Sequence, residues 1–172
     1  LDVNGNGTFD RDEQALEGVR VVVGPTFDYS DANGAYHVWD VLPYEPAQVM
    51  VDTASLASPL WVPGFAIALV EPSPNRYRSL DVPIVPAGVI EGRLTGAGAR
   101  RAGPAAITLI LENRKTGEKR RIDTFSDGSF YAMGVRAGEW QLSVDPACLT
   151  LLGAAAAPIG FVMKASAEGE SV

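Results

Sequence analysis

The chain repeats itself, and this internal repeat limits its fold more than any other feature of the sequence. Matching residues lie 94 positions apart early in the repeat and 93 positions apart late in it. Residues 31–36, 41, 49–52 and 56 are matched by residues 126–130, 135, 142–145 and 149. Such self-similarity indicates two copies of one structural unit. We therefore predict two tandem domains, residues 1–86 and 87–172, with a boundary near Pro86-Ala87.

Short runs of β-branched and aromatic residues, separated by Gly, Pro, Asn and Asp, predict strands along the whole chain. We expect them at residues 19–23, 35–39, 47–51, 65–70, 79–85, 89–94, 107–111, 119–125, 130–133 and 140–144. The best helix candidate, residues 12–18, has at most two turns. This pattern predicts an all-β protein built from β-sandwiches. By the repeat offset, the first copy lacks a strand before Leu1 and the second needs one beyond Val172, so we expect a fragment of a longer polypeptide.

The segment DVNGNGTFDRDE, residues 2–13, matches the twelve-residue loop of EF-type calcium sites. Such loops place oxygen ligands at positions 1, 3, 5, 7, 9 and 12 and a glycine at position 6. Here Gly7 stands at position 6, and Phe9 is the apolar anchor at position 8. The predicted Ca²⁺ ligands are Asp2, Asn4, Asn6, Thr8 through its carbonyl, Asp10 and Glu13. No helices flank the loop, which favours a structural site of moderate affinity over a sensor.

Composition excludes several classes of function. The net charge of −7 and the pI of about 4.7 argue against nucleic-acid binding, which needs a basic surface. The single cysteine, Cys148, cannot form an internal disulfide, and we expect it to be buried near a strand end. No segment has the roughly 18–20 apolar residues of a membrane span. The only histidine is His37, and no Ser-His-Asp set, zinc set or phosphate loop is present, so we expect no enzyme.

The three tryptophans are candidates for contacts with a ligand. Trp39 and Trp140 lie in predicted strands, and we interpret both as core or inter-sheet residues. Trp61 lies in a predicted loop and is the better candidate for a surface contact with a sugar. The competing interpretation of Trp61 is a plug over one end of the sandwich. For His37, a strand residue without a second His or Cys nearby, we expect no catalytic or metal-binding role.

Two family resemblances follow from these motifs. The calcium loop, Glu17-Gly18 with the following valines, and the turn Asp31-Ala32-Asn33-Gly34-Ala35-Tyr36 resemble the SdrD B-like repeats of bacterial surface adhesins, over about residues 1–52. Residues 89–92, 124–130 and 135–142 resemble the carboxypeptidase regulatory-like or transthyretin-like sandwich, over about residues 88–146. The resemblance implies tandem immunoglobulin-like or prealbumin-like β-sandwiches that serve as spacers, stalks or binding modules of secreted and envelope proteins.

These observations predict a non-catalytic, calcium-stabilised structural or adhesive module of a larger bacterial cell-envelope or secreted protein. We expect an extracytoplasmic location (cell surface, periplasm or secreted) and, as partners, other domains of the same chain or neighbouring envelope proteins. The first alternative is a carbohydrate-binding accessory module of a secreted enzyme, with a glycan bound at Trp61. The second is a regulatory lobe of a metallopeptidase, which would need a zinc-ligand motif that these residues do not contain.

Overall fold

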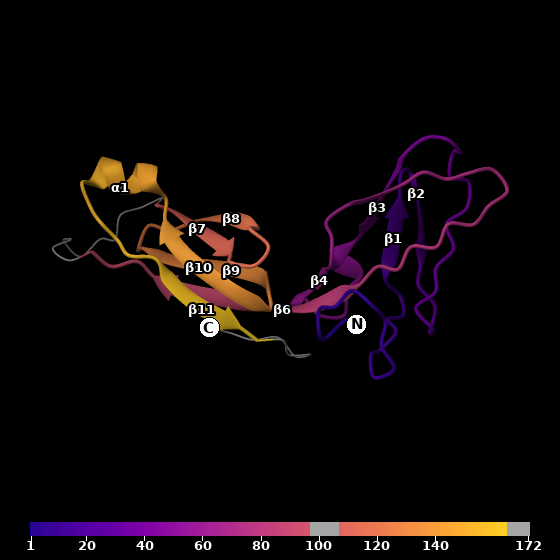
Figure 1. The fold of residues 1–172 in the computed structure, drawn as a ribbon, viewed down its shortest axis with the longest axis horizontal. Coiled ribbons are helices and arrows are strands. Elements are labelled where there is room, and N and C mark those ends of the chain that lie inside the picture. The colour runs from indigo at the N-terminus through magenta and orange to yellow at the C-terminus, as the bar shows by residue number, and fades with distance from the viewer. Residues whose placement is uncertain (97–106, 165–172) are drawn as a thin grey trace. The chain divides into compact units, whose positions relative to one another are not determined.

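The computed structural model describes residues 1–96 and 107–164, and antiparallel β-structure dominates them (Figure 1). Contacts divide the chain into two compact units, Leu1–Pro86 (unit 1) and Ala87–Val172 (unit 2). The elements are β1 (Arg20–Val23), β2 (Thr26–Tyr29), β3 (Ala47–Val51), the 3₁₀-helix η1 (Thr53–Ser55), β4 (Trp61–Pro63), β5 (Ala68–Val70), β6 (Ile84–Arg93), β7 (Thr108–Asn113), β8 (Lys119–Asp123), β9 (Ser129–Arg136), β10 (Gly138–Val144), α1 (Pro146–Leu152) and β11 (Ile159–Met163).

Unit 1 contains a four-stranded antiparallel sheet in the order β2-β1-β3-β5. The two-residue turn Gly24-Pro25 joins β1 to β2, and Gly24 adopts a φ of 55°, a left-handed conformation that costs glycine little. The valines of β1 and β3 alternate between the two faces of the sheet, so Val21, Val23 and Val49 are buried together. Separately, β4 pairs with the first three residues of β6.

Unit 2 contains a second four-stranded antiparallel sheet, in the order β11-β10-β7-β8. Hairpin β7–β8 runs across the predicted turn at residues 115–118, with Leu109 opposite Ile122. The rest of β6 pairs with β9, with an irregularity between Gly88 and Val89. Gly92 lets this pairing close, because a Cβ atom there would lie 2.6 Å from the ring of Phe130.

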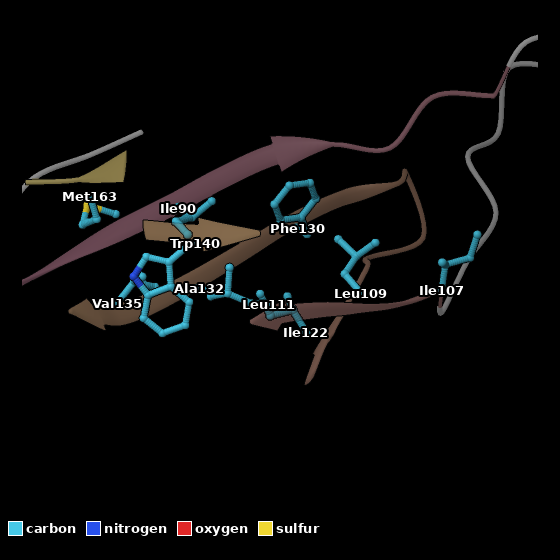
Figure 2. Packing of buried hydrophobic residues seen from close by; sticks show 10 residues of the cluster. All are labelled: Ile90, Ile107, Leu109, Leu111, Ile122, Phe130, Ala132, Val135, Trp140 and Met163. Atoms are coloured by element: carbon cyan, nitrogen blue, oxygen red, sulfur yellow. The ribbon is translucent and has the colours of Figure 1, made fainter. Parts of the chain in front are cut away.

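The hydrophobic cores of the two units differ in size. In unit 2, ten buried side chains from both sheets form one cluster, which is the core expected of a β-sandwich (Figure 2). They are Ile90, Ile107, Leu109, Leu111, Ile122, Phe130, Ala132, Val135, Trp140 and Met163. Unit 1 has two separate groups of three: Val19, Leu56 and Ile84 in one, and Val21, Val23 and Val49 in the other. Packing of apolar side chains therefore supports unit 2 more strongly.

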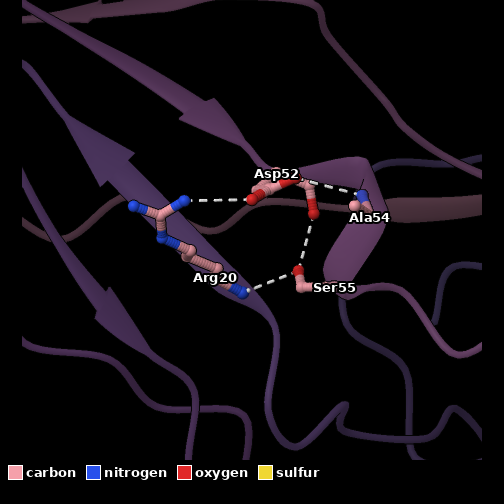
Figure 3. A network of polar contacts seen from close by, with 4 residues as sticks. All are labelled: Arg20, Asp52, Ala54 and Ser55. Atoms are coloured by element: carbon pink, nitrogen blue, oxygen red, sulfur yellow. Dashed lines mark hydrogen bonds and ion pairs between the residues drawn. The ribbon is translucent and has the colours of Figure 1, made fainter.

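In each four-stranded sheet, one strand is followed directly by an aspartate that caps a short helix. Asp52 follows β3 and caps η1, and Asp145 follows β10 and caps α1. Asp52 accepts a hydrogen bond from the Ala54 nitrogen at 3.1 Å and pairs with Arg20 at 3.1 Å, while Ser55 donates to the Asp52 carbonyl (Figure 3). In unit 2, Asp145 accepts from the Ala147 nitrogen at 2.9 Å, and Arg121 pairs with it at 2.8 Å. These two caps occupy matching positions of the sequence repeat.

The strand predictions were right in most of the chain and wrong mainly at two places, and the helix prediction was wrong. Residues 35–39 and most of residues 79–85 form no ladder, and residues 12–18 form no helix. The strands β2, β4 and β11 and the helix α1 were not predicted. Helix α1 begins behind Asp145 with Pro146 in its first turn and ends at Gly153, whose φ of 58° is typical of a helix C-cap. Among the described residues, no helix has the length and apolar character of a membrane span.

Candidate metal centre

The predicted calcium loop winds around the carboxylate of its first residue, Asp2. Asp2 Oδ1 accepts hydrogen bonds from the nitrogens of Gly5 at 2.6 Å and Asn6 at 3.2 Å, and Oδ2 accepts one from Gly7 at 2.8 Å. Gly5 and Gly7 have φ values of 72° and 75°, which allow the main chain to turn its N–H groups inward. Asp2 is only 5% exposed, so a charged carboxylate lies buried at the centre of the loop.

The two asparagines at loop positions 3 and 5 point their amide groups at Asp10. Asn4 Oδ1 accepts from the Asn6 nitrogen at 2.9 Å, and Asn6 Oδ1 accepts from the Thr8 nitrogen at 2.7 Å. Both Nδ2 atoms donate to Asp10 Oδ2, at 2.9 Å from Asn4 and 2.8 Å from Asn6. The loop therefore brings Asn4, Asn6 and Asp10 together, with amide N–H groups balancing the charge of Asp10.

Glu13, at loop position 12, closes the loop. Its Oε1 accepts a hydrogen bond from the Val3 nitrogen at 3.2 Å, and its Oε2 accepts one from the Asp10 nitrogen at 3.0 Å. A turn in which the Glu13 nitrogen donates to the Asp10 carbonyl at 3.1 Å brings this side chain back toward the loop. Glu13 thus bonds with one carboxylate oxygen to the start of the loop and with the other to Asp10 near its end.

Main-chain hydrogen bonds fix the start of the loop to β6 and join the two ends of the loop to each other. The Asp2 nitrogen donates to the carbonyl of Ile84 in β6 at 2.8 Å, and the Leu1 nitrogen donates to the carbonyl of Gln14. The predicted anchor Phe9 is 65% exposed. It lies at a pocket of about 270 Å³ that the loop shares with Val19, Val21 and Tyr36. Residues of both small core groups of unit 1, among them Val19, Val21 and Ile84, line this pocket.

The oxygen atoms of the predicted ligands suit a hard cation, although in the described residues their side chains are not gathered around one ion position. Among the residues that the structure describes, no group of three or more His, Cys, Asp or Glu side chains is gathered as metal ligands. Within the same residues, no Lys or Arg forms an ion pair with Asp2, Asp10 or Glu13. A half-turn of the Asn4 and Asn6 amides would present oxygen in place of N–H. Ca²⁺ prefers such carboxylate, amide and carbonyl oxygens.

The structure places one of the three tryptophans, Trp39, differently from its prediction. Trp140 is 1% exposed and its Nε1 donates to the Arg136 carbonyl at 2.8 Å, as expected of a core residue. Trp39 is 62% exposed, which corrects its assignment to the core. Trp61 lies in β4, half-buried against the group around Leu56, which favours the packed interpretation of Trp61 over a surface contact. The loop assignment missed that Trp61 pairs with Pro86 of β6.

Cys148 also departs from its predicted position. It lies in α1 rather than at a strand end, and it is half-buried against the core of unit 2. The sequence did carry a signal for this helix. Asp145-Pro146 is a favourable helix start, and Gly153 is a favourable stop.

Comparisons with known proteins leave the family of the chain open. No family model and no curated protein matches it, so the two family resemblances remain predictions. Among solved structures, the TIE protein of Bacillus anthracis is similar with 14% identity and a TM-score of 0.38, over 94% of this chain and 30% of that one. A streptococcal ancillary pilin is similar with 13% identity and a TM-score of 0.37, over 95% of this chain and 58% of that one.

A third solved structure is the minor pilin of the Gram-positive pathogen Streptococcus agalactiae. Its identity to this chain is 10% and its TM-score is 0.38, over 96% of this chain and 85% of that one. The chain thus spans less than two thirds of the length of the first two proteins. Similarities of this size establish neither a family nor an activity for the chain.

Proposed function

We propose that this chain is a non-catalytic structural or adhesive module of a larger bacterial cell-envelope or secreted protein. One calcium ion, held by Asp2, Asn4, Asn6, Thr8, Asp10 and Glu13, stabilises its first unit. The two units act as tandem immunoglobulin-like sandwiches, of which the first is SdrD B-like. Support for the tandem arrangement is the shared strand order of the two four-stranded sheets.

The observation that carries the calcium proposal is the buried carboxylate of Asp2 inside a loop of further acidic side chains. Burying a carboxylate without an opposite charge is costly, and here only N–H groups compensate it. A divalent cation would offset the repulsion between Asp2, Asp10 and Glu13. Because the Asp2 nitrogen is bonded to β6, fixing the loop would also fix the entry of the chain into unit 1.

Calcium titration of matched variants tests this proposal. Glu13→Gln removes the carboxylate at loop position 12, and Asp12→Asn removes the same charge from an exposed neighbour that is not a predicted ligand. Calorimetric titration with CaCl₂ in chelator-treated buffer should show one site in the unaltered chain and in Asp12→Asn. Glu13→Gln should bind at least about tenfold more weakly, because bidentate ligation at position 12 is lost.

Thermal melts of the same three proteins give the structural readout. Calcium should raise the melting temperature of the unaltered chain and of Asp12→Asn, and chelator should reverse the increase. If the melt is the same with calcium and with chelator, the ion does not stabilise the fold, and the proposed function loses its main support.

A further inference from the structure

Units 1 and 2 share individual hydrogen bonds as well as a strand order. In unit 1 the Val19 nitrogen donates to the Ser30 hydroxyl at 2.9 Å, just before β1. In unit 2 the Ile107 nitrogen donates to the Thr124 hydroxyl at 3.0 Å, just before β7. Main-chain bonds of 3.0 and 2.9 Å join the same two pairs in the opposite direction. The strands β1 and β7 therefore begin at matching residues.

The turn that follows β2 in unit 1 also matches the turn that follows β8 in unit 2. The Gly34 nitrogen donates to the Asp31 carbonyl at 2.9 Å, and the Asp31 nitrogen donates to the Ala35 carbonyl at 2.8 Å. Residues 125–129 form the same two bonds, at 2.9 and 2.7 Å. The segments behind these turns, residues 36–42 in unit 1 and β9 in unit 2, therefore take matching positions.

Residues 36–42 have the conformation of a bulged strand but no partner strand. In unit 2, β9 pairs with β6, and the ladder skips Gly134, which has a φ of 68°. A glycine in this left-handed conformation is typical of a β-bulge. The matching residue of unit 1, Asp40, has a φ of 60°. Within the described ranges, the His37 nitrogen bonds to the Asp28 side chain, but no main-chain hydrogen bond joins residues 36–42 to another segment.

The pocket of unit 1 lies at the position that β6 occupies in unit 2. Three of its lining residues have counterparts in the buried cluster of unit 2, and that cluster also contains Ile90 of β6 (Figure 2). These lining residues are Val19, Val21 and Tyr36, which match Ile107, Leu109 and Phe130. The surface that β6 covers in unit 2 is therefore the wall of an open pocket in unit 1.

One aromatic ring sets the shape of the strand that fits this pocket. In unit 2 the Phe130 ring lies against Gly92 of β6, where a Cβ atom would come within 2.6 Å of the ring. Tyr36, the counterpart of Phe130, lines the pocket and donates through its hydroxyl to the Leu80 carbonyl at 2.7 Å. A strand in the pocket therefore needs a glycine opposite Tyr36. Two residues earlier, an apolar side chain such as that of Ile90 would face the same way and fill the pocket.

The charge of the pocket restricts the partner further. Asp2, Glu13 and Asp81 line the pocket, and its lining residues in the described part of the chain include no Lys or Arg. An acidic strand would be repelled here, whereas a basic residue beside the glycine would be attracted. The strand β6 has this pattern, because Arg93 follows Gly92.

We propose that unit 1 accepts an extended strand of a neighbouring polypeptide in the pocket between Tyr36 and residues 80–84. The strand pairs antiparallel with residues 36–42, as β6 pairs with β9. It carries a glycine opposite Tyr36, an apolar residue two positions earlier and a basic residue beside the glycine. All eleven strands of the described ranges already have ladder partners, so we assign the added strand to a second polypeptide. This proposal rests on the adhesive role proposed above and deepens it by naming the kind of partner.

The test is hydrogen-exchange mass spectrometry of the unaltered chain with a synthetic peptide, run with calcium and with chelator. The peptide has the sequence of residues 87–95, with both ends blocked. At saturation it should slow the exchange of residues 36–42 at least about tenfold, because N–H groups that face the new strand gain partners. Exchange in β9, which is already paired, should stay unchanged. The control peptide carries Gly92→Val and should protect nothing, because its added side chain meets Tyr36.

An exchange of side-chain size locates the peptide in unit 1. Tyr36→Ala removes the ring, so this variant should bind the Gly92→Val peptide at least about tenfold more tightly than the unaltered chain does. Fluorescence anisotropy of the labelled peptide measures both affinities. Tyr29→Ala is the matched control, because it removes an exposed tyrosine of β2 and should leave the discrimination against Gly92→Val intact. The hydrogen-exchange measurement decides the question even if Tyr36→Ala does not fold.

The outcomes separate this inference from the proposed function. Protection of residues 36–42 by the first peptide, and not by Gly92→Val, supports the strand-acceptor site. If residues 36–42 exchange equally with and without millimolar peptide, or if both peptides protect them alike, the site is wrong. A change confined to β9 would mean that the peptide displaces β6, and it would also overturn the proposal. A calcium-dependent melt of the peptide-free chain would persist even where peptide binding fails.

Discussion

Units 1 and 2 share one sheet topology but rely on different interactions to stabilise it. Both have a hairpin at one edge of a four-stranded sheet and a later strand at the other edge. Unit 2 buries ten apolar side chains in one cluster, whereas unit 1 has two separate groups of three, and residues of both groups line a pocket. Unit 1 adds instead a polar loop of 12 residues whose side chains bond to its own main chain. Small cores commonly depend on a metal or a covalent staple, and a metal is the role that we propose for calcium in this loop.

The two units also differ in net charge. Residues 1–86 contain 12 Asp and Glu against 4 Arg and no Lys, a net charge of −8. Residues 87–172 contain 9 Asp and Glu against 10 Arg and Lys, a net charge of +1. Excess charge of one sign destabilises a compact state through self-repulsion. Unit 1 thus combines the smaller core with the larger repulsion, which is the situation where a divalent cation has the greatest effect.

Calcium removal should have the largest effect, and only on unit 1. With free calcium at a hundredfold excess over Kd, binding to the folded state alone contributes about 2.7 kcal/mol. Chelation should therefore lower the unfolding transition of unit 1 and leave that of unit 2 in place. Urea unfolding followed at Trp140 reports on unit 2, and unfolding followed at Trp61 reports on unit 1. Equal shifts at both probes would contradict the proposed difference between the units.

Matched valine truncations should sharpen the comparison of the cores. Val135→Ala removes two methyl groups from the single cluster of unit 2, where Val135 is fully buried. Val21→Ala removes the same atoms beside the existing pocket of unit 1. The first should cost on the order of 2 kcal/mol and the second roughly half of that, because fewer contacts are lost at a pocket wall. Chemical denaturation gives both values, and a larger loss for Val21→Ala would reverse the assignment of the stronger core.

The two capping aspartates offer a smaller, symmetric test. Asp52→Ala and Asp145→Ala should each cost about 1 kcal/mol, the typical loss for a helix cap. Asp52→Ala should cost more, because it leaves the half-buried guanidinium of Arg20 without its ion pair and Arg20 Nε already lacks a partner. Replacing each aspartate by Asn keeps the cap and removes the charge. If Asp52→Asn matches the unaltered chain, the ion pair contributes nothing measurable.

Acid should slightly loosen the contact between β2 and the segment around His37. Hydrogen bonds from the main-chain nitrogens of His37 and Tyr29 hold the pKa of Asp28 below its ordinary value of 3.8. A carboxyl group with a lowered pKa in the folded state stabilises that state above 3.8, and this contribution is lost as pH falls through the lower folded value. The signal of the Trp39 ring should therefore change below pH 4 in the unaltered chain. Asp28→Asn, which cannot titrate, should show less of this change.

The sequence predicted strand positions well where one face is buried. Residues 47–51, 107–111 and 140–144 alternate between apolar and polar side chains, and the structure places strands there. Around Trp39 the same alternation was ambiguous, because aromatic residues occupy both faces. Tyr36 and Val38 face inward, which forces His37 and Trp39 outward. Periodicity alone cannot decide which of two aromatic faces is buried.

For the candidate metal centre, the sequence supplied the donor residues but not their orientation. The spacing of Asp2, Asn4 and Asn6 follows from the loop pattern. That both amide nitrogens point to Asp10 depends on a side-chain rotation that no spacing rule encodes. Likewise, the pocket beside Phe9 arises from tertiary packing of distant segments, and local sequence contains no signal for it.

The strand order shared by the two sheets also sets an order of folding events. Each edge hairpin, β1–β2 or β7–β8, joins residues that are close in sequence and can form within about 1–10 μs. The central pairings join partners as distant as Val21 and Val51, or Leu109 and Val144, so each must first close a long loop. Pairing of β1 with β3 and of β7 with β10 therefore limits the folding rate of its unit. We therefore expect each hairpin to form first and to pair with β3 or β10 once that later strand has been synthesised.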